Sequence, residues 1–379
     1  SASLTSSGTV LGTSGNDTIT VSVGATPGTW TVNVNGTAVV VPAGTVDLGV
    51  DGMGGKDTIY LNLSEGADTV DLSRFGGTAT GPGYSIVLAN VEVVNVDGKG
   101  GANSAILRDT SGQDYFYARP APGISEHYDA ANSYHQNLTN FQGLRALGGE
   151  GLDAAHLNGS AGDDTFTARF GLATLVSSTG YSYRAEGFYS AHGYAVSGGT
   201  DIAVLTGTEG TDRLGGSQSE SVLTGTGYYL QAKAFPTVNA SGMGGTDYAD
   251  YSDTTGNETF VAAPGVSSLK GASYLITGAG FEIITVTAVG GNDIAHLTDS
   301  AGNNRFDAWP TRAILSGSGY SYTVNGYDAV NAYKVFGTID DAYLYDGTGA
   351  DLFVGNPTSS SMSGPVNNGG YNNRVRYFD

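Results

Sequence analysis

The 379-residue sequence has no cysteine, few basic residues and no long apolar run, and each absence excludes a class of protein. Without cysteine, neither a disulfide framework nor a thiolate metal site is available. Sixteen Lys and Arg against 36 Asp and Glu give a net charge of −20. Because nucleic acids and anionic membranes are bound through basic surfaces, we expect neither as a partner. No run of 18 apolar residues occurs, so we also expect no membrane span.

Helical signals and familiar catalytic motifs are missing as well. No stretch keeps a helical apolar period between caps, so the sequence predicts an all-β chain. There is no Gly-x-Ser-x-Gly elbow, no His-Glu-x-x-His zinc motif and no Gly-x-x-x-x-Gly-Lys phosphate loop. Glycine is abundant instead, with 60 residues, and it recurs at fixed places in a repeat.

A two-turn motif repeats along most of the chain. Each half consists of a glycine turn, an acidic or amide residue and a short alternating apolar run, as in Gly290–Leu297 followed by Ala301–Phe306. The first acidic or amide residue, here the first anchor, recurs every 46 to 50 residues, and the second anchor follows 11 residues later in all seven copies. The first anchors are Asp57, Asn103, Asp153, Asp201, Asp247, Asp293 and Asp340, and the second anchors are Asp68, Asp114, Asp164, Asp212, Glu258, Asn304 and Asp351. Such a period indicates a solenoid, a propeller or an array.

The apolar segments of one repeat predict its strands. The best-formed copy has four, at Ile294–Leu297, Phe306–Trp309, Leu315–Tyr322 and Tyr327–Val335. Four strands in about 47 residues fit two solenoid coils of about 23 residues, or one propeller blade. The doubled glycine–acid turn and the variable gaps favour a β-solenoid (parallel β-helix) of about seven 47-residue repeats. A seven-bladed β-propeller is the alternative.

Equivalent positions of the repeats hold like residues. Ala295, Leu297, Phe306 and Tyr320 each belong to such a column, and Phe260 is the equivalent of Phe306 one repeat earlier. Because stacked coils place equivalent side chains in ladders, we expect Phe260 and Phe306 to lie in contact across neighbouring coils.

Residues 1–50 differ from the array of residues 51–379. Thr18–Val23 and Thr29–Val34 alternate with period two, and Asn35-Gly36 before Ala38–Val41 is a strong hairpin signal. This part of the sequence predicts an antiparallel β-element that caps one end of the array.

Two sets of segments carry a resemblance. Gly12–Ile19 and Ala161–Phe166 resemble the turns of the calcium-binding nonapeptide repeats of RTX-type secreted proteins. Asp299–Phe306 with Leu315–Tyr320 is similar to tandem repeats of very long secreted or surface proteins of bacteria. The resemblance implies an exported, extracellular β-rich structural or adhesive protein.

The anchors are the candidate calcium ligands. Carboxylates at the corners of coils, within repeats such as Asp57 with Asp68, could bind Ca²⁺. The ligand candidates are Asp17, Asp57, Asp68, Asp164, Asp201, Asp212 and Asp293. The tandem nine-residue spacing of RTX repeats is absent, so the alternative is that these residues accept hydrogen bonds from turn N–H groups.

The irregular segment 118–140 holds the candidates for catalysis. Arg119, His127, Tyr128 and His135 are the residue types with which β-helix polysaccharide lyases and hydrolases act. The alternative is a diverged repeat whose loop bulges outward. His156 and His296 share a repeat column and are expected to point outward.

The composition and the repeats together predict an extracellular structural protein that assembles head to tail into a filament, matrix or surface layer. A polysaccharide-active enzyme and a glycan-binding adhesin are the alternatives. The chain begins at Ser1-Ala2 without a signal-peptide pattern, as a mature exported form would. The N-glycosylation sequons are at Asn16, Asn35, Asn62, Asn137, Asn158, Asn239 and Asn257.

Overall fold

The computed structural model describes residues 3–196, 198–335, 340–366 and 369–378, and all regular structure in these ranges is β. The chain divides into two compact units. Unit 1 comprises residues 1–167 and 171–200, and unit 2 comprises residues 168–170 and 201–379. The predicted division between residues 1–50 and 51–379 stays a prediction. No helix long and apolar enough to cross a membrane occurs in the described ranges.

Short strands of similar length build unit 1. They are Ser3–Leu4 (β1), Thr9–Leu11 (β2), Thr18–Val23 (β3), Trp30–Val34 (β4), Thr37–Val39 (β5), Asp47–Asp51 (β6), Thr58–Asn62 (β7), Thr69–Ser73 (β8), Gly76–Gly81 (β9), Tyr84–Ala89 (β10), Val93–Asp97 (β11), Ser104–Arg108 (β12), Asp114–Ala118 (β13), Ser125–Asp129 (β14), His135–Thr139 (β15), Gly143–Leu147 (β16), Ala154–Asn158 (β17), Leu172–Ser177 (β19), Ser182–Glu186 (β20) and Ser190–Tyr194 (β21). Asp164–Arg169 (β18) has residues in both units.

Unit 2 repeats the same pattern of strands. They are Ile202–Thr206 (β22), Arg213–Gly216 (β23), Glu220–Gly225 (β24), Tyr228–Lys233 (β25), Thr237–Ser241 (β26), Tyr248–Ser252 (β27), Thr259–Ala263 (β28), Val266–Lys270 (β29), Leu275–Ala279 (β30), Ile283–Thr287 (β31), Ile294–Thr298 (β32), Asn304–Trp309 (β33), Arg312–Gly317 (β34), Tyr320–Asn325 (β35), Ala329–Tyr333 (β36), Asp340–Leu344 (β37), Leu352–Asn356 (β38), Ser359–Val366 (β39) and Gly369–Arg376 (β40).

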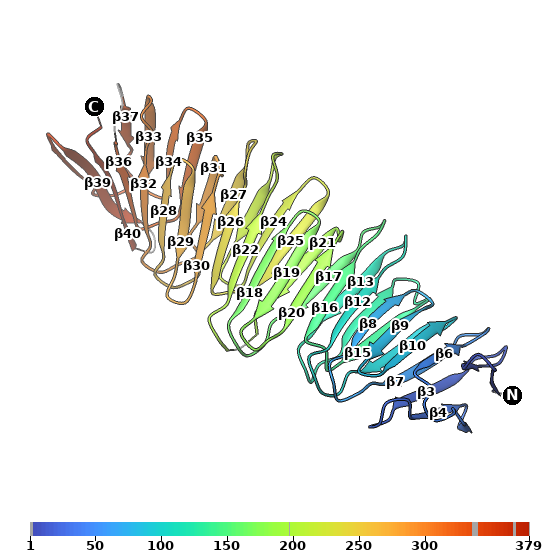
Figure 1. Ribbon diagram of the computed structural model, residues 1–379. Coiled ribbons are helices and arrows are strands. Elements are labelled where there is room, and N and C mark those ends of the chain that lie inside the picture. Colours follow the sequence, from blue (N-terminus) through green and yellow to red (C-terminus); the bar gives the residue numbers. More distant parts are fainter. Residues whose placement is uncertain (1–2, 197, 336–339, 367–368, 379) are drawn as a thin grey trace. The chain divides into compact units, whose positions relative to one another are not determined.

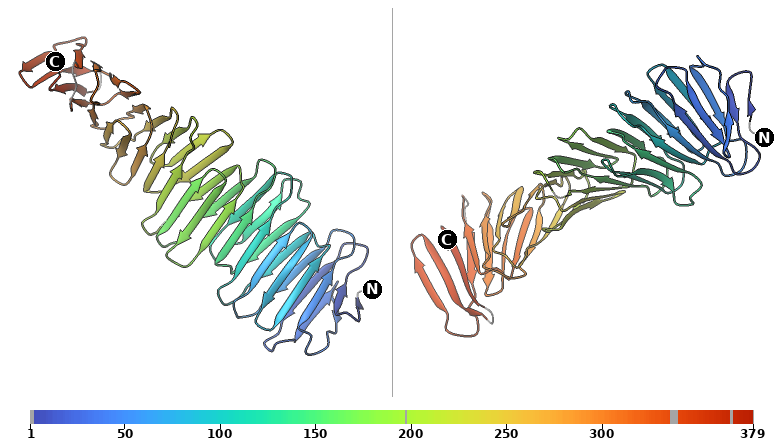
Figure 2. Two further views of the ribbon diagram at one scale, coloured as in Figure 1. Left: turned by 45° about the horizontal axis from the view of Figure 1, so that its top comes forward. Right: turned by 90° about the horizontal axis from the view of Figure 1, so that it is seen from below.

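Each unit is a β-solenoid of two facing sheets, as predicted, and the strands lie across the stack (Figures 1 and 2). The chain crosses from one sheet to the other at each corner, and strands of successive coils pair in parallel. In unit 2, β32 pairs in parallel with β28 and β36, and β27 pairs in parallel with β23 and β31. Alternate residues of a strand point inward and are buried, so the core lies between the sheets.

One pass in three is a three-stranded antiparallel meander rather than a single strand. β33, β34 and β35 form one such meander, and β28, β29 and β30 form another in the opposite sheet. The predicted single segment Leu315–Tyr322 was therefore wrong, because it contains the hairpin between β34 and β35. Gly319 supplies the left-handed conformation of that turn, with φ 81°.

The number of coils per repeat also differs from the prediction. Between one first anchor and the next, the chain makes three passes, namely a single strand, a meander and a single strand. Since two passes complete a turn, one repeat makes one and a half turns and not the two coils predicted. Successive repeats therefore begin in opposite sheets.

This half-turn makes the predicted ladder of like residues wrong. Phe260 lies in β28 and Phe306 lies in β33, in opposite sheets. The parallel neighbour of Phe260 is Ala295, and that of Phe306 is Ala342. A large residue of one repeat thus pairs with a small residue of the next. The repeats do stack on one another, but the residues that meet come from different columns of the repeat.

The inner rows of the sheet alternate large and small side chains. One row runs Phe260, Ala295, Val330, and the row two residues further along the strands runs Ala262, Leu297, Ala332. All six side chains are buried. Large residues in one row therefore fill the space left by alanines in the next, as close packing requires.

The N-terminal region uses the same meander. β3, β4 and β5 pair antiparallel, and the predicted hairpin turn at Asn35-Gly36 is confirmed, with φ 52° and 77°. β3 also pairs in parallel with β7, so this element continues the stack of unit 1.

Candidate functional site

Acidic and amide residues line the corners at the start of the strands, and each connects two rungs. In unit 2 the Asp212 N–H donates to Asp247 Oδ1 at 2.8 Å, and the Asp247 N–H donates to Glu282 Oε2 at 2.8 Å. Asp212 Oδ2 also accepts the Thr208 N–H at 2.7 Å. The carboxylates thus satisfy backbone donors where the chain turns, which confirms the structural interpretation of these residues.

The two anchors of one repeat do not converge, so the proposed pairing of Asp57 with Asp68 is wrong. Asp57 precedes β7 and Asp68 precedes β8, in opposite sheets. Instead, a second anchor lies beside the first anchor of the following repeat, as Asp212 lies beside Asp247, because the half-turn brings those two onto one corner. The remaining candidates are placed as follows: Asp17 donates its N–H to Asp57, Asp68 donates its N–H to Asn103, Glu258 donates its N–H to Asp293, Asp164 accepts the Ser160 N–H, and Asp201 is buried.

Buried tyrosines complete several corners. Tyr84 donates its hydroxyl to Asp68 Oδ1 at 2.7 Å, and both side chains are buried. Burial is the main cause that raises the pKa of both groups. The same contact recurs between Tyr134 and Asp114.

Removing one of these hydroxyls is expected to destabilise the corner. In Tyr84→Phe, Asp68 loses a donor in a buried place, and hydrogen bonds to charged groups contribute about 1.5–3 kcal/mol. Denaturant unfolding measures this loss. Tyr60→Phe, on an exposed tyrosine, is the control and is expected to change stability by less than about 0.5 kcal/mol. Equal losses in the two variants would contradict this role.

Two corners carry three carboxylates each, which we call cluster 1 and cluster 2. Cluster 1 is Asp109, Asp114 and Asp153 in unit 1, and cluster 2 is Asp253, Glu258 and Asp293 in unit 2. Within each cluster, one oxygen from every member lies within 4.8 Å of the others. Burial and the neighbouring carboxylates raise the pKa of Asp109 and of Asp253 to about 7. These are the described side chains best suited to hold a metal ion.

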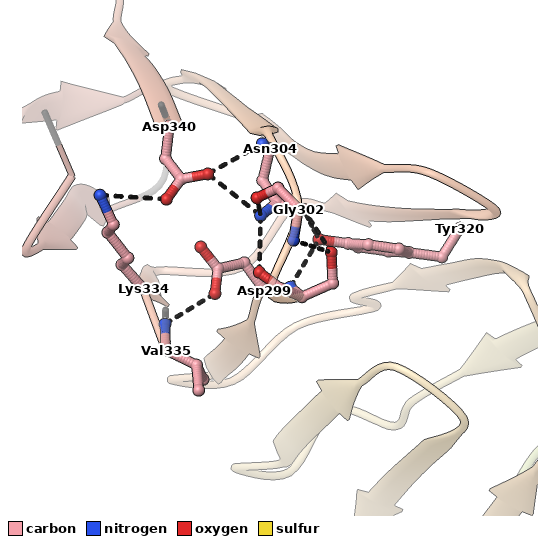
Figure 3. A network of polar contacts seen from close by, with 8 residues as sticks. Asp299, Gly302, Asn304, Tyr320, Lys334, Val335 and Asp340 are labelled. Atoms are coloured by element: carbon pink, nitrogen blue, oxygen red, sulfur yellow. Dashed lines mark hydrogen bonds and ion pairs between the residues drawn. The ribbon is translucent and has the colours of Figure 1, made fainter. Parts of the chain in front are cut away.

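A third corner has the same plan with different charges (Figure 3). Asp299, Asn304 and Asp340 occupy it, and Asn304 stands where the other two corners have an acid. The Lys334 ammonium lies 3.2 Å from Asp340 Oδ2. We call this corner cluster 3. Its buried carboxylates have a cation supplied by the chain itself.

The sequence identified two anchors in each cluster but not the third member. Asp109, Asp253, Asp299 and Asp346 each lie five residues before a second anchor, where the other three repeats have Leu63, Gly159 and Gly207. An acid at this position, rather than the anchors alone, was the signal in the sequence.

The catalytic candidates of segment 118–140 lie on two sides of one sheet. His127 in β14 is buried, contacts Gln136 and Tyr134, and its pKa is lowered to about 4 by burial. Arg119 and His135 both contact Glu126 on the outer face, at 2.6 and 3.4 Å.

Tyr128 is only half-buried, and burial and Tyr117 raise its pKa to about 12. The structure therefore brings Arg119 and His135 together through Glu126 and separates His127 from them. A polysaccharide cleft at this segment stays a prediction.

An outward ladder of rings passes beside this segment in unit 1. Tyr117, His156 and His192 stack face to face, with centroids 4.4 and 4.5 Å apart. Burial and the neighbouring His192 lower the pKa of His156 to about 4. The outward position of His156 was expected, as was that of His296, which contacts Tyr333 at 3.1 Å. Because the rings cover one another's faces, they offer edges rather than platforms for sugar rings.

The sequons differ in the use of the amide nitrogen that would carry a glycan. Asn35, Asn62, Asn137 and Asn158 use it as a hydrogen-bond donor within the fold. At Asn16, Asn239 and Asn257 the amide oxygen accepts a hydrogen bond and the side chain is exposed. If glycans are present, we expect them at these last three.

Comparison of the chain with models of known protein families and with curated proteins found no match.

Proposed function

We propose that this chain is a structural module of an exported or surface protein, in which stacked coils form a stiff scaffold that associates through the edge of a coil. The observation that supports association is an uncovered strand, β38, in unit 2. Among the described residues, β38 pairs with β39 only. Leu352, Phe353 and Val354 in this strand are exposed by 61, 58 and 48%.

The equivalent strands indicate what would cover this edge. Phe353 is the column-mate of Phe260 and Phe306, which are fully buried because a further parallel strand lies beside each of them. That strand presents alanine opposite the phenylalanine. An open strand edge with apolar side chains is a template for strand addition. The fitting occupant is one more coil of this same repeat, here supplied by a second copy of the chain.

Association is tested on the chain of residues 1–379. Sedimentation velocity is expected to show species that grow with protein concentration, and electron microscopy is expected to show ordered assemblies. Phe353→Lys places a charge where a covering strand would bury it, so this variant is expected to remain monomeric.

The control is Val261→Lys. Val261 is an exposed apolar residue of unit 2 on a strand that is already paired on both edges, and the charge change is the same. This variant should assemble like the unsubstituted chain. A monodisperse monomer at all concentrations, or assembly that Phe353→Lys leaves intact, would contradict the proposal.

A further inference from the structure

Cluster 2 contains several buried oxygens that have no partner within the protein. Asp253 Oδ2 and Glu258 Oε2 accept no hydrogen bond, although the two side chains are only 6 and 3% exposed. The hydroxyls of Tyr274 and Tyr327 are also buried without a partner, and burial and the charges of these same carboxylates raise the pKa of both tyrosines. Buried polar groups are rarely left unsatisfied, so four such groups at one corner indicate a bound group.

Cluster 1 has the same character. Asp153 Oδ1 accepts the Asp114 N–H at 2.9 Å, but its Oδ2 is buried without a partner. Asp109 Oδ2 accepts the Gly149 N–H at 2.8 Å, and Asp114 Oδ1 accepts the Tyr134 hydroxyl at 2.6 Å. Backbone and hydroxyl donors therefore cover one side of these carboxylates and leave oxygens facing one another.

The same hydrogen bonds recur at equivalent residues of the three corners. The N–H groups of Gly149, Val289 and Val335 donate to Asp109, Asp253 and Asp299 respectively. The residues just before these donors are Gly148, Ala288 and Lys334. Each of these donates its N–H to the last residue of the next strand in the sheet, which is Glu186, Asn325 and Arg376 respectively. Lys334 therefore occupies the position of Gly148 and Ala288.

The charges at the three corners differ in a consistent way. Clusters 1 and 2 each hold three carboxylates, and the residue at the Lys334 position is glycine or alanine. Cluster 3 has an amide, Asn304, in place of one carboxylate and has the ammonium of Lys334 on Asp340 (Figure 3). The corner with the smallest negative charge is thus the one that carries its own cation. Uncompensated buried carboxylates of like charge are strongly unfavourable.

We propose that cluster 1 and cluster 2 each bind one hard divalent cation, with Ca²⁺ as the ion, and that Lys334 takes the place of this ion in cluster 3. The atoms that would coordinate the ion are all oxygens, which suits Ca²⁺ and Mg²⁺ rather than softer metals. Two ligands on opposite sides of Ca²⁺ lie about 4.6–5.2 Å apart. The spacing of at most 4.8 Å within each cluster fits an ion at its centre.

The binding stoichiometry is the first test. Calorimetric titration with CaCl₂ in about 0.15 M NaCl, which screens weak surface binding, is expected to give two saturable sites per chain. Asp253→Asn and Ala288→Lys should each leave one site, the latter because it grafts the Lys334 ammonium into cluster 2. Asp153→Asn should also leave one. MgCl₂ in place of CaCl₂ tests the choice of ion.

The matched control is Asp250→Asn. Asp250 is an exposed acid of unit 2 outside the cluster, and its substitution changes the net charge equally. This variant should keep both sites. The absence of saturable binding, or equal binding by Asp253→Asn and Asp250→Asn, would overturn the proposal. Ala288→Lys also tests it through stability, because its unfolding midpoint in a chelator should exceed that of the unsubstituted chain.

The pH dependence of the calcium effect is a second readout. Asp253 faces Glu258, Asp293, Tyr274 and Tyr327, and Asp109 faces Asp114, Asp153 and Tyr134. None of these neighbouring side chains is cationic.

A carboxyl whose pKa is about 7 in the folded state and about 3.9 in the unfolded state binds more protons when folded. Its contribution to stability is therefore present below pH 4 and is lost as pH rises from about 4 to 7. Because Ca²⁺ needs the ionised carboxylates, the upward shift of the melting midpoint by CaCl₂ should grow from pH 5 to pH 8. A shift that is independent of pH would contradict binding at these groups.

Discussion

Phe260→Ala is expected to destabilise the protein by about 3–5 kcal/mol, the usual cost of truncating a buried phenylalanine. Phe260 is fully buried, and its neighbour in the next strand of the sheet is Ala295. An alanine cannot move to fill the space that the ring leaves, because its Cβ is fixed to a strand paired on both edges. Most of the cavity therefore remains, and the loss of stability lies toward the upper end of that range.

Phe353→Ala is the matched control for this prediction. It makes the same change at the equivalent position of a later repeat, but the Phe353 ring is 58% exposed. Denaturant unfolding of the two variants at a concentration where the chain is monomeric should give a much smaller loss for Phe353→Ala. Similar losses would contradict the view that the covering strand, rather than the residue type, creates the core.

The pairing itself can be tested with a compensating substitution. Ala295→Phe alone overpacks the row and is expected to cost about 1–3 kcal/mol. Combined with Phe260→Ala, it returns a ring to the same row, so the double variant should be more stable than the sum of the single effects predicts. Phe260→Ala and Phe306→Ala lie in opposite sheets and should combine additively. Non-additive stability effects of Phe260→Ala and Phe306→Ala would instead support the ladder of like residues.

The sequence predicts the all-β solenoid because its spacing is regular. The anchors recur at 46–50 residues, and the doubled glycine turn of each repeat favours a solenoid over the alternative of a propeller. It could also be predicted that the anchors accept hydrogen bonds from turn N–H groups, since Asp and Asn after glycine favour turns. These inferences depend on local chemistry alone.

The path of the chain between the sheets could not be read from the same pattern. The short turn at Ser318-Gly319 hides a hairpin inside one apolar segment, and this hairpin adds two strands without adding a pass across the core. Whether a repeat makes one and a half turns or two decides which residues meet. For this reason the partnership of Phe260 with Ala295 could not be predicted from equivalent positions.

The grouping of the acids into clusters was missed for the same reason. Asp109 and Asp153 belong to different repeats, and only the half-turn places them on one corner. No motif around Lys334 in the sequence indicates its role either. Its meaning depends on the hydrogen bonds that make it equivalent to Ala288, and these involve strands far apart in the chain.

Lys334→Met is expected to destabilise the protein by about 3–5 kcal/mol in a chelator, because it leaves a buried carboxylate without its partner. Asp340 is fully buried, and the Lys334 side chain is only 13% exposed, so water does little to replace the ammonium. Methionine keeps the length of the side chain, so packing changes little. Denaturant unfolding in a chelator gives the size of the loss.

Restoring the charge balance in two ways separates electrostatics from packing. Asp340→Asn in the Lys334→Met background removes the uncompensated charge. The amide oxygen at position 340 can still accept the hydrogen bonds of Asn304, so this double variant should recover part of the lost stability. Calcium should recover stability in a different variant, Lys334→Ala with Asn304→Asp, which gives cluster 3 the three carboxylates and the small residue of cluster 2. A third calcium site would then appear in titration. If Lys334→Met unfolds at the same denaturant concentration as the unsubstituted chain, then the ammonium does not balance the charge of these carboxylates. This result would also contradict the proposal that the ammonium takes the place of a bound ion.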